Sequence, residues 1–258
     1  MARLEYDRYY RALEAETSRL ADAVCGADLA RPVPTCPEWT LARLAGHVGR
    51  AHRWAAAIVE QRATEPVPAG QLPDRELPDA DPDRSAWLQD GASRLVTAVR
   101  AAGPGTRVWS WADEQTAGFW ARRMVYETLV HRADAELALG RRVELAADLA
   151  ADGIGEWLDI LALGRVEALR VGDLRGDGQT LHFHATDGGL GEAGEWLVRR
   201  TPAGVVWQHG HGKGDAAVRA AVGDLYLLLM RRIPADDPRV ELLGDTALVR
   251  HWLANTAF

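Results

Sequence analysis

The chain has 258 residues, of which 47% are hydrophobic and 26% are charged, and its formal net charge is −7. This balance is ordinary for a globular protein, and an acidic chain without a basic stripe is not expected to bind nucleic acid. No apolar run approaches the roughly 20 residues that span a bilayer. Because the N-terminal residues also lack the pattern of a signal peptide, a cytoplasmic location is expected. Cys25 and Cys36 are expected to be free thiols, since neither belongs to a Cys-x-x-Cys pair.

The first two thirds of the chain carry helical periodicity. Apolar residues recur at helical spacing over residues 1–26, and Gly26 with three prolines then breaks the pattern before Thr40, a suitable N-cap. Further helices are predicted over residues 40–62, 85–102, 116–139 and 146–163. The acidic, proline-rich segment 64–84 is predicted to be a long loop. Helices connected in this way indicate an up-and-down bundle, which we place in residues 1–168.

The pattern changes in residues 169–258. The run Thr-Leu-His-Phe-His-Ala-Thr, at 180–186, alternates as a strand does, and two more short strands are predicted around a Thr-Pro-Ala-Gly turn. Residues 214–233 and 247–258 are predicted to be helices. Strands followed by helices indicate an α+β protein, with a small α/β domain after the helical bundle.

Two of the predicted helices carry polar groups on apolar faces. Glu127 and His131 are four residues apart, so both lie on a stripe with Trp120 and Met124, while arginines occupy the opposite face. A buried carboxylate is costly unless it is paired or bound to a metal. His47 lies on the apolar stripe of the helix at 40–62. Together these residues could form a two-histidine, one-carboxylate set of the kind that holds zinc or iron.

Interpretations of these residues that involve no metal also stay open. A histidine on an apolar face is more often a satisfied core residue than a ligand, and Glu-x-x-x-His is common by chance. His52 also lies on an apolar stripe, but it is five residues from His47 and points roughly 140° away, so the two are not expected to share one ion. His182, His184, His209 and His211 form two His-x-His runs. Such runs usually decorate an exposed face of a sheet, and we favour that interpretation over a second metal site.

The residues around His47 and His131 resemble a known family. The stretch TCPEWTLARLAGHVGRAHRWA is similar to the N-terminal signature of the mycothiol-dependent maleylpyruvate isomerases and their DinB-like relatives. The matching residues are Cys36, Pro37, Trp39, Thr40, Leu44 and His47. The stretch RRMVYETLVHRADAELALG resembles the fourth-helix motif of this family, with Glu127, His131, Arg132 and Asp134 in register. Two C-terminal stretches are also similar, so the resemblance spans nearly the whole chain.

The resemblance implies a DinB-like four-helix bundle that binds a divalent metal, usually zinc, and a smaller domain similar to the sterol-carrier-protein fold. It assigns His47, Glu127 and His131 to the ligand positions and leaves His52 out. It also implies mycothiol, a low-molecular-weight thiol of actinobacteria, as the cosubstrate. Such a source agrees with the arginine-rich composition, in which Lys213 is the single lysine. In an isomerase the thiolate adds to the double bond of maleylpyruvate, the bond rotates, and the thiol leaves to give fumarylpyruvate.

Four more residues are site candidates. Arg232, or Arg231 beside it, stands where the resemblance places an arginine suited to a dicarboxylate, although a solvated arginine is an equal alternative. Asp134 is a second catalytic candidate: it either orients a metal ligand, or it caps or pairs with an arginine, and we favour the latter. Trp54 and Trp120 are expected to lie near the metal and its thiol.

The expected partners are mycothiol and a small-molecule substrate, with no nucleic acid or membrane, in a monomer or weak homodimer. Two alternatives to the isomerase remain. One is a mycothiol S-transferase of natural-product biosynthesis or detoxification, which uses the same metal site with a different substrate pocket. The other is a non-catalytic, metal-binding regulatory protein that kept the bundle.

Overall fold

The computed structural model describes residues 3–68, 70, 72–164 and 171–256, and the chain divides into two compact units. One unit is formed by Leu4–Val143, and the other contains Glu144 onward together with the first residues of the chain. The boundary that the sequence suggested, between residues 168 and 169, lies outside the described residues and stays a prediction. Within the described residues, no helix is long and apolar enough to cross a membrane.

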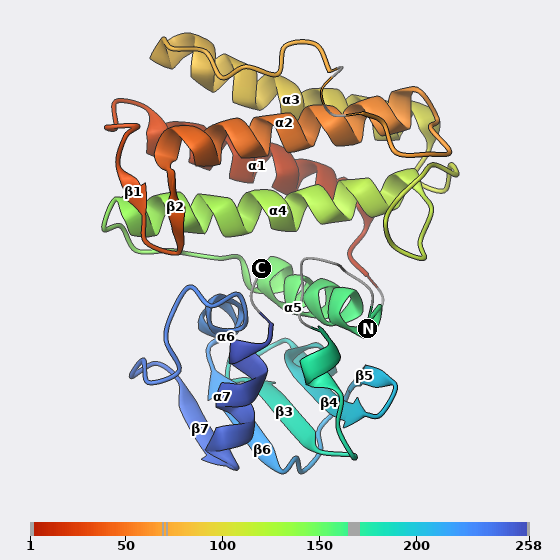
Figure 1. The fold of residues 1–258 in the computed structure, drawn as a ribbon, viewed down its shortest axis with the longest axis vertical. Coiled ribbons are helices and arrows are strands. Elements are labelled where there is room, and N and C mark those ends of the chain that lie inside the picture. Colours follow the sequence, from red (N-terminus) through yellow and green to blue (C-terminus); the bar gives the residue numbers. More distant parts are fainter. Residues whose placement is uncertain (1–2, 69, 71, 165–170, 257–258) are drawn as a thin grey trace. The chain divides into compact units, whose positions relative to one another are not determined.

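The first unit is a bundle of helices with a small hairpin (Figure 1). Its elements are α1 (Tyr6–Val24), β1 (Pro32–Val33), β2 (Cys36–Thr40), α2 (Leu41–Glu60), α3 (Asp81–Ala102) and α4 (Ala117–Ala138). Helix α1 packs on α4 and α3, and helix α2 packs on α3 and α4. The four helices therefore bury their apolar faces against one another, whereas the fifth predicted helix, 146–163, belongs to the second unit.

Local signals fix the ends of the two helices that matter most for the site. Thr40 accepts a hydrogen bond from the backbone N–H of Arg43 at 3.3 Å, so it caps α2 as expected. Thr116 caps α4 in the same way through Phe119, and Gly140 follows α4 with a φ of 69°. Helix α3 begins at Asp81, four residues before the predicted start. The reason is that a proline in the first turn, with acidic neighbours, favours the start of a helix.

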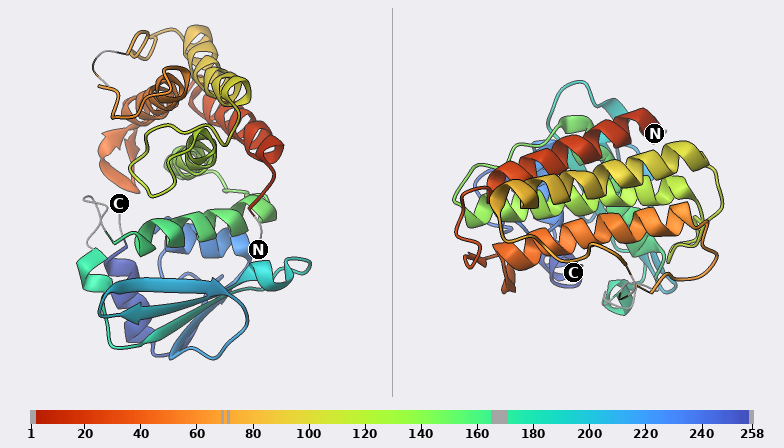
Figure 2. Two further views of the ribbon diagram at one scale, coloured as in Figure 1. Left: turned by 90° about the vertical axis from the view of Figure 1, so that its right-hand side faces the viewer. Right: turned by 90° about the horizontal axis from the view of Figure 1, so that it is seen from above.

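The second unit is a five-stranded sheet with helices on one face (Figure 2). Its elements are α5 (Ala147–Ala162), the short 3-10 helices η2 (Val171–Leu174) and η3 (Gly191–Gly194), β3 (Thr180–Ala185), β4 (Glu195–Thr201), β5 (Gly204–His209), β6 (Ala216–Ala220), α6 (Val222–Leu229), β7 (Glu241–Gly244) and α7 (Thr246–Ala254). The strand order is β5-β4-β3-β6-β7, and all neighbours are antiparallel except β3 and β6. Phe183 and Trp196 point from the sheet toward the helices and are fully buried. The mixed α+β fold is confirmed.

The prediction of one helix over residues 214–233 is wrong in its first half. Residues Ala216–Ala220 form the strand β6 in the middle of the sheet, between β3 and β7, and only Val222–Leu229 is helical. Alanine-rich sequence favours a helix in isolation, but here the sheet supplies partners on both edges of the segment, and tertiary pairing overrides the propensity. The edge strand β7 was not predicted.

Candidate functional site

The site candidates of the first unit converge between α2 and α4. The Nε2 atom of His47, on α2, donates to Oε1 of Glu127, on α4, over 2.7 Å. Nε2 of His131, one turn along α4, lies 3.4 Å from the same oxygen. One ligand atom from each of these three residues lies within 4.8 Å of the other two. The structure thus brings together the two imidazoles and the carboxylate that the sequence grouped.

A buried aspartate fixes the orientation of one imidazole. Asp134 has no exposed surface, and its Oδ2 accepts a hydrogen bond from Nδ1 of His131 at 2.9 Å. The hairpin holds the aspartate from the other side, because Thr35 Oγ1 donates to it at 2.5 Å and the Cys36 thiol at 3.7 Å. Because Nδ1–H of His131 is directed at Asp134, its Nε2 faces Glu127, and loss of the Nε2 proton would give a lone pair that can bind a metal. This arrangement is typical of a histidine that ligates a metal.

Neighbouring charges and hydrogen bonds explain how Glu127 and His131 stay ionised although both side chains are mostly buried at the site. Burial by itself raises the pKa of Glu127, but hydrogen bonds from His131 and His47, with the charge of Arg123, hold it well below its usual range. Arg123 lies 2.8 Å from Oε2 of Glu127. For His131, burial lowers the pKa, whereas the hydrogen bonds to Asp134 and Glu127 raise it to about 9. The site is therefore built around a fixed carboxylate charge that a cation can neutralise.

The tryptophan beside the site is one that sequence reasoning did not assign to it. The ring of Trp39, on β2, lies 4.8 Å from the ring of His47 and 5.5 Å from that of His131. The signal that could have identified Trp39 from the sequence is its place in the Cys-Pro-x-Trp-Thr motif. The site remains accessible from the side of His47, whose side chain is 37% exposed.

Trp54 and Trp120, the expected cofactor-binding residues, lie in a separate aromatic cluster. Their rings are 5.1 Å apart, and both contact Trp109. Each is seven residues, or two helical turns, from a candidate ligand on its own helix, which corresponds to roughly 10 Å along the axis. Their side-chain N–H groups bond backbone carbonyls, that of Trp54 to Val67 and that of Trp120 to Trp109. Their part in binding a thiol stays a prediction.

His52 lies apart from the candidate ligands, as its spacing indicated. It is fully buried, and its Nε2 contacts Thr128 Oγ1 at 2.7 Å. The face of α4 opposite the site is buried as well, including Arg132, which bonds Glu16 at 2.6 Å and Glu136 at 2.5 Å. These contacts tie α4 to α1 through a buried ion network around Arg132. The sequence placed arginines on this face, but Arg123 lies on the side of Glu127.

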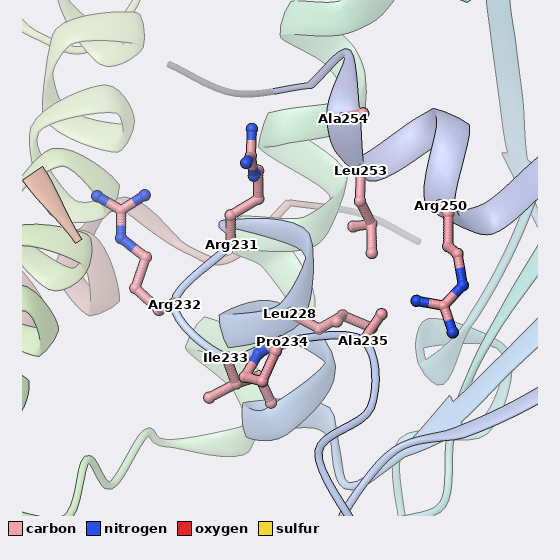
Figure 3. A pocket seen from close by; sticks show the side chains of 9 residues that line it. All are labelled: Leu228, Arg231, Arg232, Ile233, Pro234, Ala235, Arg250, Leu253 and Ala254. Atoms are coloured by element: carbon pink, nitrogen blue, oxygen red, sulfur yellow. The ribbon is translucent and has the colours of Figure 1, made fainter. Parts of the chain in front are cut away.

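Arg232 and Arg231 both line a pocket of the second unit (Figure 3). The pocket has a volume of about 540 Å³, and its other lining residues are Leu228, Ile233, Pro234, Ala235, Arg250, Leu253 and Ala254. Three arginines around an otherwise mostly apolar pocket suit an anionic ligand with a hydrocarbon part. In Figure 3 the guanidinium groups of Arg231 and Arg232 diverge from the end of α6, and Arg250 comes from α7.

Fold and site together define a helical-bundle protein that presents a two-histidine, one-carboxylate site and carries an additional α+β unit. The family models agree and cover most of the chain. Residues 10–136 match "Mycothiol maleylpyruvate isomerase N-terminal domain", and residues 148–251 match "MDMPI C-terminal domain". The chain belongs to the mycothiol maleylpyruvate isomerase family.

Solved structures show the same fold. A crystal structure of the mycothiol-dependent maleylpyruvate isomerase is similar with a TM-score of 0.52, and one of its point mutants with a TM-score of 0.55. In both, the identity is 15%, and the similarity covers 94% of this chain and 95% of the other. A UbiJ-SCP2 ubiquinone synthesis protein is 22% identical over 44% of this chain and 93% of its own, but its TM-score of 0.31 supports no inference. No curated protein matches the chain significantly.

Proposed function

We propose that this protein is a mycothiol-dependent isomerase of a maleylpyruvate-like cis-dicarboxylate, with a divalent metal held by His47, Glu127 and His131. The observation that supports this most strongly is the convergence of the two imidazole nitrogens on one carboxylate oxygen, at 2.7 and 3.4 Å. Family membership supports the thiol and the reaction type.

The residues present fit a zinc-type ion. Two imidazole nitrogens and one carboxylate oxygen form a donor set that catalytic zinc accepts with a fourth position open, and Asp134 supplies the outer hydrogen bond that such a ligand usually has. Bound zinc lowers the pKa of a coordinating thiol, which supplies thiolate at neutral pH. A second group, formed by Cys36, His131 and Asp134, also lies within 4.8 Å. It shares His131 but uses the ring nitrogen that Asp134 already occupies, so we favour the set with Glu127.

The protein's own side chains position the reactants. Arg123 holds Oε2 of Glu127, which leaves Oε1 directed toward the two imidazoles. Trp39 covers one side of the two imidazoles, and the exposed edge of His47 is where we expect the thiol to enter. We assign substrate carboxylate binding to Arg232, because a planar guanidinium holds a carboxylate through two hydrogen bonds. The mycothiol sulfur then adds to the double bond, the resulting single bond rotates, and elimination of the thiol gives the trans product.

The test combines metal analysis with turnover. Purified protein is loaded with Zn²⁺ and mixed with mycothiol and maleylpyruvate, and the absorbance change of the substrate is followed. We expect turnover that needs both the metal and the thiol and is lost in the His47→Ala and Glu127→Ala variants. His251→Ala, which removes an exposed histidine on α7, is the matched control and keeps full activity.

The products distinguish the alternatives from the isomerase. Release of free mycothiol with a trans product supports the proposal, whereas a stable thioether adduct identifies an S-transferase. A protein that binds Zn²⁺ through His47 and Glu127 but leaves maleylpyruvate unchanged contradicts the assigned substrate. For Arg232, the Arg232→Ala variant is expected to raise the KM for the dicarboxylate and to leave the metal content unchanged.

A further inference from the structure

A second cluster of metal-ligand side chains lies in the C-terminal unit, far along the sequence from the site between α2 and α4. It contains His182 and His184 of β3, Glu195 of β4 and His211, which follows β5. One ligand atom of each of the four lies within 4.8 Å of all the others. We propose that these four residues form a second, structural site for Zn²⁺ or a closely similar transition metal.

The sheet register explains why the four side chains meet. His182 and His184 alternate along β3, so both lie on the face of the sheet opposite Phe183, which packs near Trp252 of α7. Glu195 stands directly across from His184 in the antiparallel pair of β3 and β4. The cluster therefore lies on the face of the sheet that the helices do not cover.

His211 reaches this face through a break in the chain. His209 is paired with Trp196, so it lies on the helix-covered face. A strand that continued regularly would place His211 on that face too. Gly210 has a φ of 138°, which a residue with a side chain rarely adopts, and the turn brings His211 to Glu195 on the other face. Gly210 is thus what makes a fourth ligand available.

All three imidazoles are directed at one carboxylate. Nε2 of His182 lies 2.5 Å from one oxygen of Glu195, and Nδ1 of His184 lies 2.8 Å from the other. Nδ1 of His211 also lies 3.2 Å from that second oxygen. Ligands of a tetrahedral zinc ion are about 3.3 Å apart, given zinc–nitrogen bonds of roughly 2.0 to 2.1 Å. The four ligand atoms, all within 4.8 Å of one another, lie near that spacing.

The donor set selects the class of metal. Three nitrogens and one oxygen suit Zn²⁺, and they do not suit Mg²⁺ or Ca²⁺, which take oxygen ligands. Four protein ligands leave no open position, which is the feature of a structural site. The side chain of His182 is 7% exposed and that of Glu195 is 15% exposed, whereas that of His211 is 77% exposed. The metal would therefore fasten the turn after β5 to a preformed part of the sheet.

The test separates this site from the one between α2 and α4. The full-length protein carrying His47→Ala and Glu127→Ala is freed of metal with a chelator, reloaded with Zn²⁺ or Co²⁺, and desalted. We expect one metal ion per chain, a visible Co²⁺ absorption of tetrahedral intensity, and a higher melting temperature with Zn²⁺ but not with Mg²⁺.

Two further variants in that background test the ligands. His184→Ala with His211→Ala is expected to lose more affinity for Zn²⁺ than the roughly 10- to 100-fold that removal of an outer-shell partner costs. The control is His209→Gln, which removes the neighbouring histidine on the opposite face and is expected to retain the ion. The proposal is overturned if the background protein, folded by circular dichroism, binds no Zn²⁺, or if the ligand variants bind it as tightly as His209→Gln does.

Discussion

The buried histidine of the bundle makes a quantitative prediction about acid stability. Thr128 Oγ1 donates to the carbonyl of Met124 at 2.6 Å, so it accepts from Nε2–H of His52, and His52 is neutral with its proton on Nε2. Among the described residues, no group hydrogen-bonds its Nδ1. A second proton would have no acceptor, and burial, with the charge of Arg53, lowers the pKa of His52 to about 3.

The direction in which stability changes with pH follows from the linkage between proton binding and unfolding. Because the folded pKa lies below the unfolded value of about 6.5, the unfolded state binds the extra proton first as the pH falls. The contribution of His52 to stability is therefore fully present above pH 6.5 and is lost progressively toward pH 3. At about 1.4 kcal/mol per pH unit, the loss between pH 7 and pH 4.5 is about 2 to 3 kcal/mol.

The variant His52→Gln isolates this effect, since a glutamine can still donate to Thr128 but does not titrate. Urea denaturation of metal-free protein at pH 7 and at pH 4.5 gives the free energies of unfolding. The wild type is expected to lose about 2 to 3 kcal/mol more than the variant over this interval. His251→Gln, at an exposed position, is expected to follow the wild type. Parallel pH profiles of the wild type and His52→Gln would refute the assigned tautomer and protonation state.

Three further predictions concern α4. Asp134→Asn should weaken Zn²⁺ binding roughly 10- to 100-fold in competition with a chelator, because the imidazole of His131 loses its charged acceptor; unchanged affinity would deny Asp134 an orienting role. Trp120→Ala should lower the free energy of unfolding by about 3 to 5 kcal/mol in urea without altering metal content. Arg132→Met should lower the free energy of unfolding by a similar amount, about 3 to 5 kcal/mol, since it leaves the buried Glu16 and Glu136 to the more distant Arg19, 3.7 Å from each. A loss below about 1 kcal/mol, as for an exposed ion pair, would contradict this.

Most of the bundle could be predicted from the sequence because its signals are local. Periodicity and caps depend on residues within one or two turns of each other, so Thr40 marked the start of α2 correctly. The strand β6 could not be found in this way, since only its neighbours β3 and β7 make its alanines a strand. The same holds for the hairpin of β1 and β2, two short segments that pair only with each other.

The residues of the candidate site likewise fall into those related by local spacing and those brought together by packing. Glu127 and His131 share a face of α4 because they are four residues apart, so their proximity could be predicted from the sequence. The link to His47 required a second helix: its apolar stripe made His47 a possible partner, and the motif resemblance then selected it over His52. Trp39 was missed because an aromatic stripe on α2 and α4 pointed to Trp54 and Trp120, whereas the hairpin delivers a different ring to the imidazoles. Contacts between elements that are far apart in the sequence depend on tertiary packing, and the periodicity of a single element does not predict them.

The two histidine–carboxylate clusters contain the same kinds of ligand, but they differ in the number of ligand atoms and in the residues that hold them. Between α2 and α4, Arg123 and Asp134 hold Glu127 and His131 from outside, and His47 leaves one side exposed. External support frees the inner ligand atoms for an added ligand, as thiol activation requires. On the sheet, three imidazoles and Glu195 together supply four ligand atoms, which is the number that fills a tetrahedral coordination shell. The set between α2 and α4 supplies three ligand atoms and leaves a fourth position for an exchangeable ligand, so we expect reactivity there and a stabilising role for the cluster on the sheet.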